Sequence, residues 1–477
     1  MKTEARNLTM MTDLYQLTMM NGYFLDGTYK NEAVFDLFFR SGAQLNYAVA
    51  AGLEQAVDYI KNLRFDKADV EYLSGLNIFA PEFINYLRDF KFTGDIYSVE
   101  EGEIVFPGEP IMVVKAPLIE AQLIETTLLN IVSHQTLIAT KASRIVLAAG
   151  DKTVVEFGLR RAQGPDAGIY GARASIIGGC KGTSNVLAGQ MFKIDVKGTH
   201  SHSWVMSYPS ELEAFRAFAK IYPDNCLLLV DTFDTLKSGV PNAIKVFGEL
   251  RAAGHKPVGI RLDSGDLAYL SKKARIMLDE AGFSDAIIFA SNDIDENLIS
   301  QLRLQDAKIN VYGVGTKLIT SHDMPSLGGV YKLAEIERGG VRYPRMKFSD
   351  STEKTTNPGF KTVYRIYEKG SGKAFADLIA LCDEQPLVKP LTLTHAVDRW
   401  KQTTLTDYDA RKLHKQIFRR GELVYACPPL SDSVKFSADE LGRFWDEYKR
   451  LSNPHIYKVD LSDKLYALKL ELLGAKK

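Results

Sequence analysis

The chain has 477 residues, more than one ordinary hydrophobic core holds, so we expect it to fold as two or three domains. Apolar residues make up 45% of the sequence and charged residues 25%, which is the composition of a soluble globular protein. The 59 basic and 59 acidic residues cancel, so the sequence lacks the broad positive field that nucleic-acid binding requires. A local basic pocket for one phosphorylated ligand remains compatible with this balance.

The N-terminus and the cysteines indicate the compartment. The first residues, "MKTEARNLTMMTDLYQ", carry charges where a secretory signal needs an apolar run. No uninterrupted apolar segment approaches the roughly 18 residues that span a bilayer. The four cysteines lie far apart without a CxxC pair, which predicts free thiols in a reducing environment. We therefore expect a cytoplasmic protein that contacts neither membrane nor nucleic acid.

Residues 1–135 mix short helical and strand-like runs. The segment 101–117, "EGEIVFPGEPIMVVKAP", predicts two strands on either side of a Pro-Gly turn. Residues 120–150 are mostly helical in character and lead away from this part of the chain. We therefore predict a mixed α/β domain over residues 1–135, completed by C-terminal segments.

From about residue 150 to 336, apolar strand-like runs alternate with amphipathic helical stretches. Examples of the strand-like runs are "CLLLVDTF", "PVGIRLD" and "INVYGVGT". Ser210 with Glu213 has the pattern of a helix capping box, and Asp295 is a candidate N-cap. Strand-then-helix repetition at roughly 25–35 residues per unit is typical of a parallel sheet, either a barrel or an open doubly wound sheet.

Chemically capable residues stand where these strand-like runs end. They are Arg160 and Arg161, Thr199 to His202, Asp231 and Asp234, Arg261 and Asp263, Asn292 and Asp293, and Gly315 and Thr316. In a (β/α) barrel such positions converge on one mouth, whereas in an open sheet they spread along a crevice. Convergence favours a (β/α) barrel over residues 136–340, beside the mixed α/β sheet domain. Residues 341–477 then form a return segment with a C-terminal helical extension.

The segment 197–204, "KGTHSHSW", contains two of the eight histidines and allows three interpretations. Residues two apart in a strand face the same way, so His200 and His202 could bind one metal, as in metal-dependent barrel hydrolases. That interpretation needs further ligands, and the later strands supply few histidines. The alternatives are a solvated polar strand end and a single reactive histidine.

Two further patterns suit an anionic ligand. In "GIRLDSGDL" (259–267), strand alternation puts Arg261 and Asp263 on one face, where one can bind an anion and the other hydroxyl groups. Asp263 or Ser264 could equally cap the helix that begins near Asp266. The glycine-bearing turns in "YGVGTKL" (312–318) and "SLGGVYKL" (326–333) would let backbone N–H groups approach a phosphate.

Taken together and in order, these segments resemble the nicotinate phosphoribosyltransferase family. The resemblance covers about residues 10–335 and is carried by "MTDLYQLTM", "FPGEPIMVV", "FGLRRAQGPD", "GTSNVLAG", "GTHSHSW", "IRLDSGDL", "SNDID" and "SLGGVYKL". It implies the type II phosphoribosyltransferase architecture, an irregular α/β barrel with a separate mixed domain. It also implies a homodimer with the active site at the interface.

The resemblance implies transfer of the phosphoribosyl group of phosphoribosyl pyrophosphate to nicotinate. The products would be nicotinate mononucleotide and pyrophosphate, with ATP converted to ADP and phosphate, in the first step of NAD salvage from nicotinic acid. Such an enzyme is ATP-dependent and of ligase type. Mg²⁺ would neutralise the pyrophosphate, with Asp231 and Asp234 as its candidate protein ligands.

The resemblance also implies roles for single residues. His202, which precedes a Ser-aromatic pair, would be phosphorylated by ATP, and His200 would be dispensable for that step. Tyr15 would stack on the pyridine ring from across the dimer interface. The remaining roles are nicotinate binding for Arg160, Thr199 and Arg261, ribose binding for Asp263, and phosphate binding for Gly315 and Thr316.

Ser184 bears on the choice of substrate. The related nicotinamide-using enzyme is similar but has an aspartate here, reading GTDT where this chain reads GTSN. An aspartate would accept from an amide and repel a carboxylate, so Ser184 predicts preference for the acid. Three other functions stay open at this point: a metal-dependent barrel hydrolase, a non-catalytic sensor of nicotinate or nucleotide, and a quinolinate-using transferase without ATP.

Overall fold

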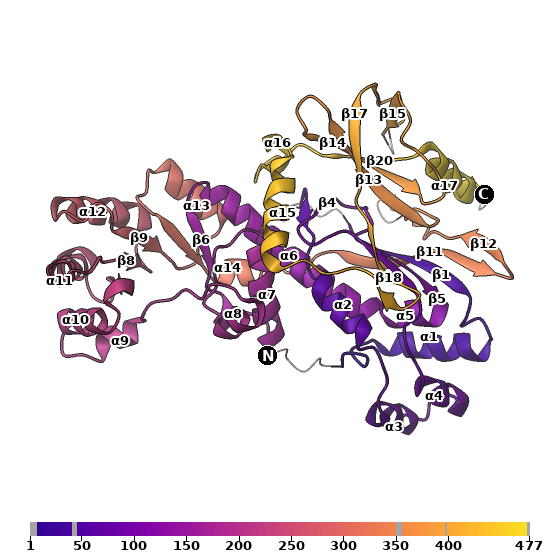
Figure 1. Ribbon diagram of the computed structural model, residues 1–477, viewed down its shortest axis with the longest axis horizontal. Coiled ribbons are helices and arrows are strands. Elements are labelled where there is room, and N and C mark those ends of the chain that lie inside the picture. The colour runs from indigo at the N-terminus through magenta and orange to yellow at the C-terminus, as the bar shows by residue number, and fades with distance from the viewer. Residues whose placement is uncertain (1–6, 41–44, 350–354, 396–397, 475–477) are drawn as a thin grey trace. The chain divides into compact units, whose positions relative to one another are not determined.

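The computed structural model describes residues 7–40, 45–349, 355–395 and 398–474 (Figure 1). The chain divides into two compact units, of which the first combines residues 1–140 with 326–477 and the second comprises residues 141–325. These bounds differ from those expected at 135 and 340, because residues 326–340 belong to the first unit. Among the described residues, no helix combines the length and the apolar character that crossing a bilayer requires.

The first unit is built on a seven-stranded sheet in the order β12-β11-β1-β5-β3-β18-β19. Its strands are β1 (Glu32–Phe39), β3 (Asp95–Ser98), β5 (Met112–Pro117), β11 (Gly329–Arg338), β12 (Val341–Pro344), β18 (Lys415–Arg419) and β19 (Glu422–Leu423). The strands β1 and β5 are buried over most of their length, so they form the middle of the sheet. Strands β11, β12, β18 and β19 come from the far end of the sequence and pair antiparallel within this sheet.

The Pro-Gly turn near residue 108 separates two strands, as expected. The first, β4 (Ile104–Val105), pairs with β2 (Ala48–Val49), and the second is β5 of the large sheet. The two strands have different partners, so this segment is not a hairpin. The helices of the first unit are α1 (Leu14–Leu25), α2 (Leu53–Lys61), α3 (Lys67–Gly75), α4 (Pro81–Leu87), α5 (Leu118–Leu123), α15 (Leu430–Gly442), α16 (Asp446–Lys449) and α17 (Asp463–Gly474). Helix α6 (Glu125–Ala149) begins in the first unit and ends in the second.

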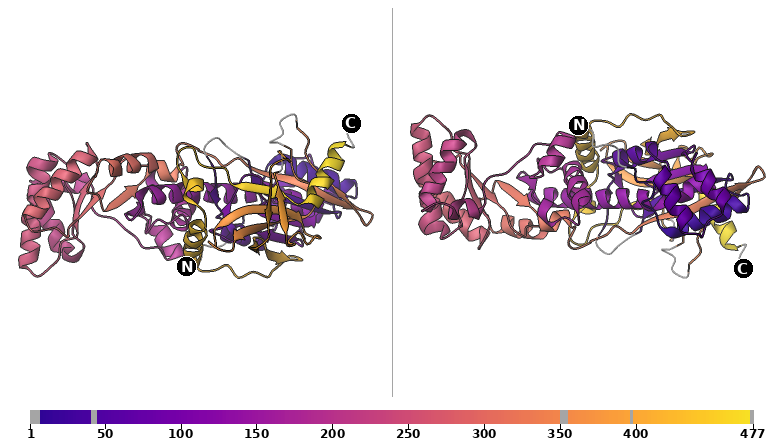
Figure 2. Two further views of the ribbon diagram at one scale, coloured as in Figure 1. Left: turned by 90° about the horizontal axis from the view of Figure 1, so that it is seen from above. Right: turned by 90° about the horizontal axis from the view of Figure 1, so that it is seen from below.

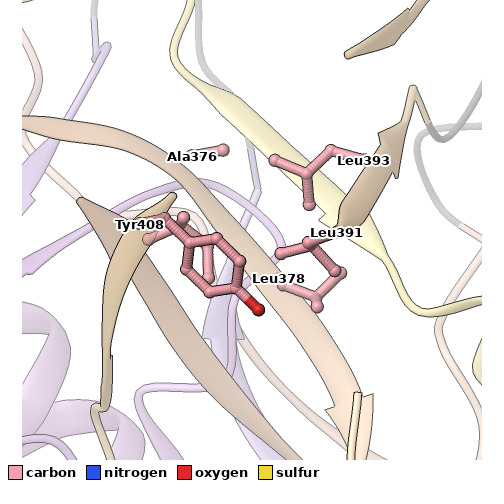
Figure 3. Packing of buried hydrophobic residues seen from close by; sticks show 6 residues of the cluster. Ala376, Leu378, Leu391, Leu393 and Tyr408 are labelled. Atoms are coloured by element: carbon pink, nitrogen blue, oxygen red, sulfur yellow. The ribbon is translucent and has the colours of Figure 1, made fainter. Parts of the chain in front are cut away.

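A second sheet of the first unit forms from the C-terminal residues, in the order β17-β13-β14-β20. Its strands are β13 (Lys361–Glu368), β14 (Ala374–Leu381), β17 (Tyr408–Lys412) and β20 (Lys458–Leu461), and the hairpin β15 (Leu391–Thr394) with β16 (Gln402–Leu405) lies beside it. A small core of Ile366, Ala376, Leu378, Leu391, Leu393 and Tyr408 joins this sheet to the hairpin (Figure 3).

The second unit is a parallel sheet of five strands in the order β6-β10-β9-β8-β7. The strands are β6 (Thr153–Glu156), β7 (Leu227–Leu229), β8 (Gly259–Leu262), β9 (Ile287–Ala290) and β10 (Val311–Val314). Its helices are α7 (Pro165–Ile177), α8 (Val186–Phe192), α9 (His202–Met206), α10 (Glu211–Ile221), α11 (Val240–Ala252), α12 (Leu267–Glu280), α13 (Glu296–Leu304) and α14 (Thr316–Ile319). Helices α10, α11 and α12 lie side by side along the sheet (Figures 1 and 2).

The helix starts follow the sequence signals in two cases and differ in a third. The Ser210 side chain accepts the N–H of Glu213, and the Asp295 side chain accepts that of Leu298, so both predicted N-caps are confirmed. Helix α12 is capped by Asp266, whose side chain accepts the N–H of Tyr269. The capping role considered for Asp263 or Ser264 was therefore wrong, which leaves both residues for other contacts.

The structure shows no closed sheet, so the barrel prediction is not confirmed. Within residues 141–325, all of which the structure describes, β6 and β7 are the outer strands and do not pair with each other. The residues between them form helices and only two isolated parallel bridges, Glu156 with Thr183 and Thr183 with Val196. The segment 178–182, "GGCKG", is rich in glycine, and Gly179 has φ +108°, a conformation that interrupts strands. The alternation of strands and helices was correct, but closure was not.

Candidate active site

The candidate site lies at the carboxyl ends of the parallel strands of the second unit. Asp231 stands two residues after the end of β7, Arg261 is the third residue of β8, and Asp263 follows that strand. Ser291 follows β9, and Gly315 follows β10. Carboxyl ends of neighbouring parallel strands meet at one edge of the sheet, which is where open α/β sheets bind ligands. The structure thus brings several of the expected residues together without a closed barrel.

Asp231 is the centre of this group. Its side chain is only 1% exposed, and its Oδ1 lies 3.3 Å from Nε2 of His202. Its Oδ2 accepts the N–H of Asp263 at 2.8 Å and the hydroxyl of Ser264 at 2.6 Å. One carboxylate therefore connects the histidine segment to the turn after β8. A buried carboxylate that accepts from one ring nitrogen holds an imidazole in one tautomer and leaves the other nitrogen with its lone pair.

His202 was expected at the end of a strand, but it is the first residue of helix α9. Its side chain is 38% exposed, so a ligand can reach the ring. His200 differs, because it is buried and both of its ring nitrogens are engaged. Its Nε2 accepts the N–H of Leu229 at 3.2 Å, and its Nδ1 lies 3.3 Å from the carbonyl oxygen of Ser201. The two histidines therefore do not form the shared metal clamp considered above.

Arg261 is held by two side chains and keeps donors free. Its Nε donates to Oγ of Ser291 at 2.9 Å, and its Nη2 donates to Oδ1 of Asp263 at 3.0 Å. The Ser291 hydroxyl also donates to the same carboxylate oxygen. The guanidinium carbon lies 5.7 Å from the ring centre of Phe157. A guanidinium fixed in this way, with its side chain 14% exposed, can offer its remaining N–H groups to a planar carboxylate.

Ser184 is positioned by the end of β6. Its N–H donates to the carbonyl oxygen of Glu156 at 2.9 Å, and the neighbouring Asn185 caps helix α8. The Glu156 side chain is buried and accepts the Thr183 hydroxyl at 2.5 Å and the N–H of Gly158. Burial raises the pKa of Glu156 above its ordinary value. These contacts place the half-buried Ser184 next to the chain that continues into Phe157.

The glycines after β6 and β10 allow these two strand ends to approach each other. A Cβ on Gly315 would lie 3.2 Å from the carbonyl oxygen of Phe157, and a Cβ on Gly158 would lie 2.4 Å from Cβ of Ile319. Thr316, which follows Gly315, begins helix α14. The closeness is therefore a backbone requirement, whatever else these residues bind.

Three other expected residues lie on the surface of the second unit. Arg160 is exposed in the short 3₁₀ helix Leu159–Arg161, and Thr199 is half-buried, with its hydroxyl accepting the N–H of His200. Asp234 accepts the N–H groups of Lys237 at 2.9 Å and Leu236 at 3.1 Å, and these bonds hold its pKa below the usual value. Asp234 is thus an N-cap.

The carboxylates do not fit a metal site built from protein ligands alone. Asp234 is used as a helix cap, and both oxygens of Asp231 have partners. Among the described residues, no group of three or more His, Cys, Asp or Glu side chains could hold a metal ion. A magnesium ion in this region would therefore depend on the oxygens of a phosphorylated ligand.

Tyr15 belongs to the first unit, where it lies in the first turn of α1. Its side chain remains 46% exposed, although Gln16 Nε2 donates to its hydroxyl at 3.3 Å. Burial of the hydroxyl and the charge of Glu125 raise the pKa of Tyr15 to about 12. The residue is therefore a neutral phenol whose ring is available for stacking.

Ser291, Ser264 and Glu156 are contacts of this site that were not predicted from the sequence. The signal for Ser291 was available, because a serine that ends a buried strand stands next to the ends of the neighbouring strands. Ser264 was considered only as a helix cap. Glu156 ends β6, yet nothing in "TVVEFG" indicates that its side chain would turn back to the N–H of Gly158.

Two family models match the parts of the sequence that precede and follow the parallel sheet. The model of the nicotinate phosphoribosyltransferase N-terminal domain matches residues 10–133, and the model of the C-terminal domain matches residues 360–469. The nicotinate phosphoribosyltransferase of Bacillus subtilis is 50% identical over 467 residues, which cover 98% of this chain and 95% of the relative.

Two solved structures are similar over most of the chain. The human nicotinic acid phosphoribosyltransferase has a TM-score of 0.86 and 32% identity, covering 97% of this chain and 99% of the human one. A nicotinate-nucleotide pyrophosphorylase from Pyrococcus furiosus has a TM-score of 0.70 and 21% identity, covering 91% of this chain and 95% of its own, and shares the fold.

Proposed function

Because the chain belongs to the nicotinate phosphoribosyltransferase family, we propose that it transfers the phosphoribosyl group of phosphoribosyl pyrophosphate to nicotinate by way of a phosphohistidine at residue 202. The products are nicotinate mononucleotide and pyrophosphate, as in the first step of NAD salvage from nicotinic acid. The observation that carries the proposal is the pairing of His202 with the buried Asp231, which also binds the turn beside Arg261.

The proposed role of ATP follows from the state of the two side chains. Asp231 accepts from one ring nitrogen of His202, so the lone pair of the other nitrogen attacks the γ-phosphorus of ATP. A nitrogen–phosphorus bond forms, the bond to the bridging oxygen breaks, and ADP leaves. Asp231 stabilises the positive charge that develops on the imidazole. Water later cleaves the nitrogen–phosphorus bond and releases phosphate.

We assign nicotinate binding to Arg261, with Arg160 and Thr199 as further contacts. The free N–H groups of Arg261 suit the substrate carboxylate. Arg261 and Ser291 both donate to Oδ1 of Asp263, which leaves Oδ2 for a ribose hydroxyl. The pyridine nitrogen of nicotinate carries no proton at neutral pH, so it attacks the sugar carbon directly and no general base is required. Pyrophosphate leaves with the bonding electrons.

The phosphate end of the site is assigned to the backbone at Gly315 and Thr316. Mg²⁺ is expected to accompany the pyrophosphate groups of the substrates, since the carboxylates in the part of the chain that the structure describes do not form a site of their own. Ser184 lacks the charge that an aspartate would direct at nicotinate, which supports the acid over the amide as substrate.

The assembly and the compartment are also proposals. A homodimer would allow the exposed ring of Tyr15 to stack on the pyridine ring in the site of its partner. The four cysteines are free thiols, which supports the cytoplasm as the compartment.

The proposed ATP coupling is tested by His202→Ala. Pyrophosphate release is measured with nicotinate and phosphoribosyl pyrophosphate, in the presence and absence of ATP. We expect the variant to lose its stimulation by ATP and to keep a slow transfer that does not need ATP. His255→Ala, which removes a histidine from the surface of the same unit, is the matched control. Normal stimulation of the His202 variant by ATP would overturn the assignment.

A further inference from the structure

His200 lies on the chain segment that passes the free edge of strand β7. In the parallel sheet, β7 pairs only with β8, and the N–H of Val230 donates to the carbonyl oxygen of Arg261 on that side. Successive N–H groups of a strand point to opposite sides, so the N–H of Leu229 points to the free edge. There it donates to Nε2 of His200 at 3.2 Å, inside the buried part of the molecule.

The contacts at Leu229 and Asp231 align the histidine segment with β7 and its extension in a single register. His200 reaches Leu229, and His202 reaches Asp231, so each histidine contacts the residue 29 positions later. The two histidines are two residues apart, as are their partners. The segment 200–202 is therefore fixed against β7 and its extension at two points. One point is the proposed phosphoryl acceptor, and the other is a neutral histidine.

The His200 ring is packed so that it stays an acceptor. Its centre lies 4.8 Å from that of Phe218 in an edge-on arrangement and 6.2 Å from that of Phe215, and both aromatic residues come from α10. Burial lowers the pKa of His200 to about 4, and the nearby charges of Arg261 and His202 act in the same direction. At neutral pH the ring carries no charge, so its Nε2 lone pair remains available to the N–H of Leu229.

We propose that His200 is a positioning residue, which sets the register of the segment against β7 and thereby places His202 at hydrogen-bonding distance from Asp231. The proposal rests on the proposed phosphohistidine chemistry for its effect on catalysis, but the pairing itself is independent of it. It also revises the expectation that His200 is dispensable: the ring takes no phosphoryl group, yet the residue that does depends on it. Nothing in the spacing of the two histidines indicates this division of roles.

Two substitutions of His200 distinguish its role as a hydrogen-bond acceptor from its role in packing, and a third substitution serves as the control. His200→Gln puts an amide oxygen near the position of Nε2, so it can still accept from Leu229. His200→Phe keeps an aromatic ring against Phe218 but leaves the buried N–H of Leu229 without a partner. His255→Phe removes a histidine that pairs with Asp224 at the surface of the same unit, and serves as the matched control.

The first readout is the rate at which ATP phosphorylates the full-length protein. We expect His200→Phe to slow phosphorylation by about tenfold or more, because an unpaired buried N–H destabilises the register. His200→Gln should stay within about threefold of the parent rate, since the acceptor is retained. Equal rates for His200→Phe and the parent, or an equal loss in both His200 variants, would overturn the proposal. Melting temperatures of all variants establish that each one folds.

The second readout does not depend on phosphorylation. Nitrogen-15 NMR of labelled histidines reports the tautomer of His202, which the bond to Asp231 fixes. We expect His200→Phe to change the His202 signals and His200→Gln to leave them near those of the parent. If the parent protein carried no phosphate on residue 202 after treatment with ATP, the phosphohistidine would be refuted. Unchanged His202 signals in His200→Phe would refute the role of His200.

Discussion

Two arginines of this molecule are held by neighbouring side chains, and the way they differ separates structure from binding. In the first unit, Arg365 is 0% exposed and donates to Glu103 at 2.6 Å, to both oxygens of Asp377 and to the carbonyl oxygen of Ile104. In the second unit, Arg261 donates to one serine and one aspartate and keeps donors free at the sheet edge.

The structural arginine and the binding arginine carry the same charge, but they differ in how many of their N–H donors are engaged by the protein itself. Arg365 forms hydrogen bonds with all three of its guanidinium nitrogens and connects strand β13 to residues 103–104, which are far away in the sequence. A buried ion pair of this kind stabilises only while every partner is present. Arg261 is oriented by its partners but not consumed by them, as a ligand-binding guanidinium must be.

Arg365→Met should destabilise the protein strongly without acting on the site directly. It leaves the carboxylates of Glu103 and Asp377 buried with reduced compensation, which costs about 3–5 kcal/mol. Urea denaturation measures the loss. Arg216→Met removes a surface pair with Glu249 and should have no measurable effect. If both variants unfold at the same urea concentration, the saturated arginine is not a structural one.

Arg261→Lys should preserve the fold and impair catalysis. Lysine keeps the charge but lacks the planar fork that reaches Ser291, Asp263 and a substrate carboxylate together. We expect a loss of about 1.5–3 kcal/mol in transition-state stabilisation, or about 10- to 150-fold in kcat/KM for nicotinate. Steady-state kinetics and a melting curve on the same sample measure both quantities. A normal kcat/KM would remove Arg261 from the nicotinate site.

Ser184→Asp should act on the choice of substrate. The added carboxylate would repel nicotinate and could accept from the amide of nicotinamide, so kcat/KM for nicotinate should fall by about tenfold while that for nicotinamide does not. Ser184→Asn, which adds similar bulk without charge, is the control. Competition assays with both substrates give the ratio directly, and an unchanged ratio in the aspartate variant would contradict the assignment.

Glu109→Gln should flatten the dependence of stability on pH. Burial and the neighbouring Asp377 raise the pKa of Glu109 well above its ordinary value of 4.5. The folded protein therefore holds this proton more tightly than the unfolded chain, and stability falls as the pH rises above that ordinary value. A glutamine is neutral in both states, so this contribution to the slope disappears. Denaturation midpoints at several pH values measure the slope, and identical slopes would show that Glu109 is ionised in the fold.

The sequence predicted the parts of the site that depend on strand ends, and it could not predict those that depend on partners. Apolar runs followed by Asp231, Arg261 and Gly315 indicated a parallel sheet whose edge carries the chemistry, and this edge exists. Closure into a barrel depended on the segment after β6, which forms only isolated bridges at Thr183 and Val196. Strand propensity along the chain does not reveal such a failure to pair.

The roles of the two histidines show the same limit. Sequence spacing treats His200 and His202 alike, because alternation is local and burial is not. Phe218, which packs on His200, is 18 positions away in the sequence, and Asp231, which contacts His202, is 29 positions away. Asp234 was expected to bind a metal because of its place after a strand-like run. In the structure its side chain instead caps the helical turn that begins at residue 235.

The central claim, phosphorylation of His202, is tested most directly by incubating the full-length protein with γ-labelled ATP and locating the label. We predict an acid-labile, base-stable phosphate on His202, which disappears as pyrophosphate forms after addition of nicotinate and phosphoribosyl pyrophosphate. If ATP still stimulated transfer while residue 202 carried no label, the phosphohistidine account would be contradicted.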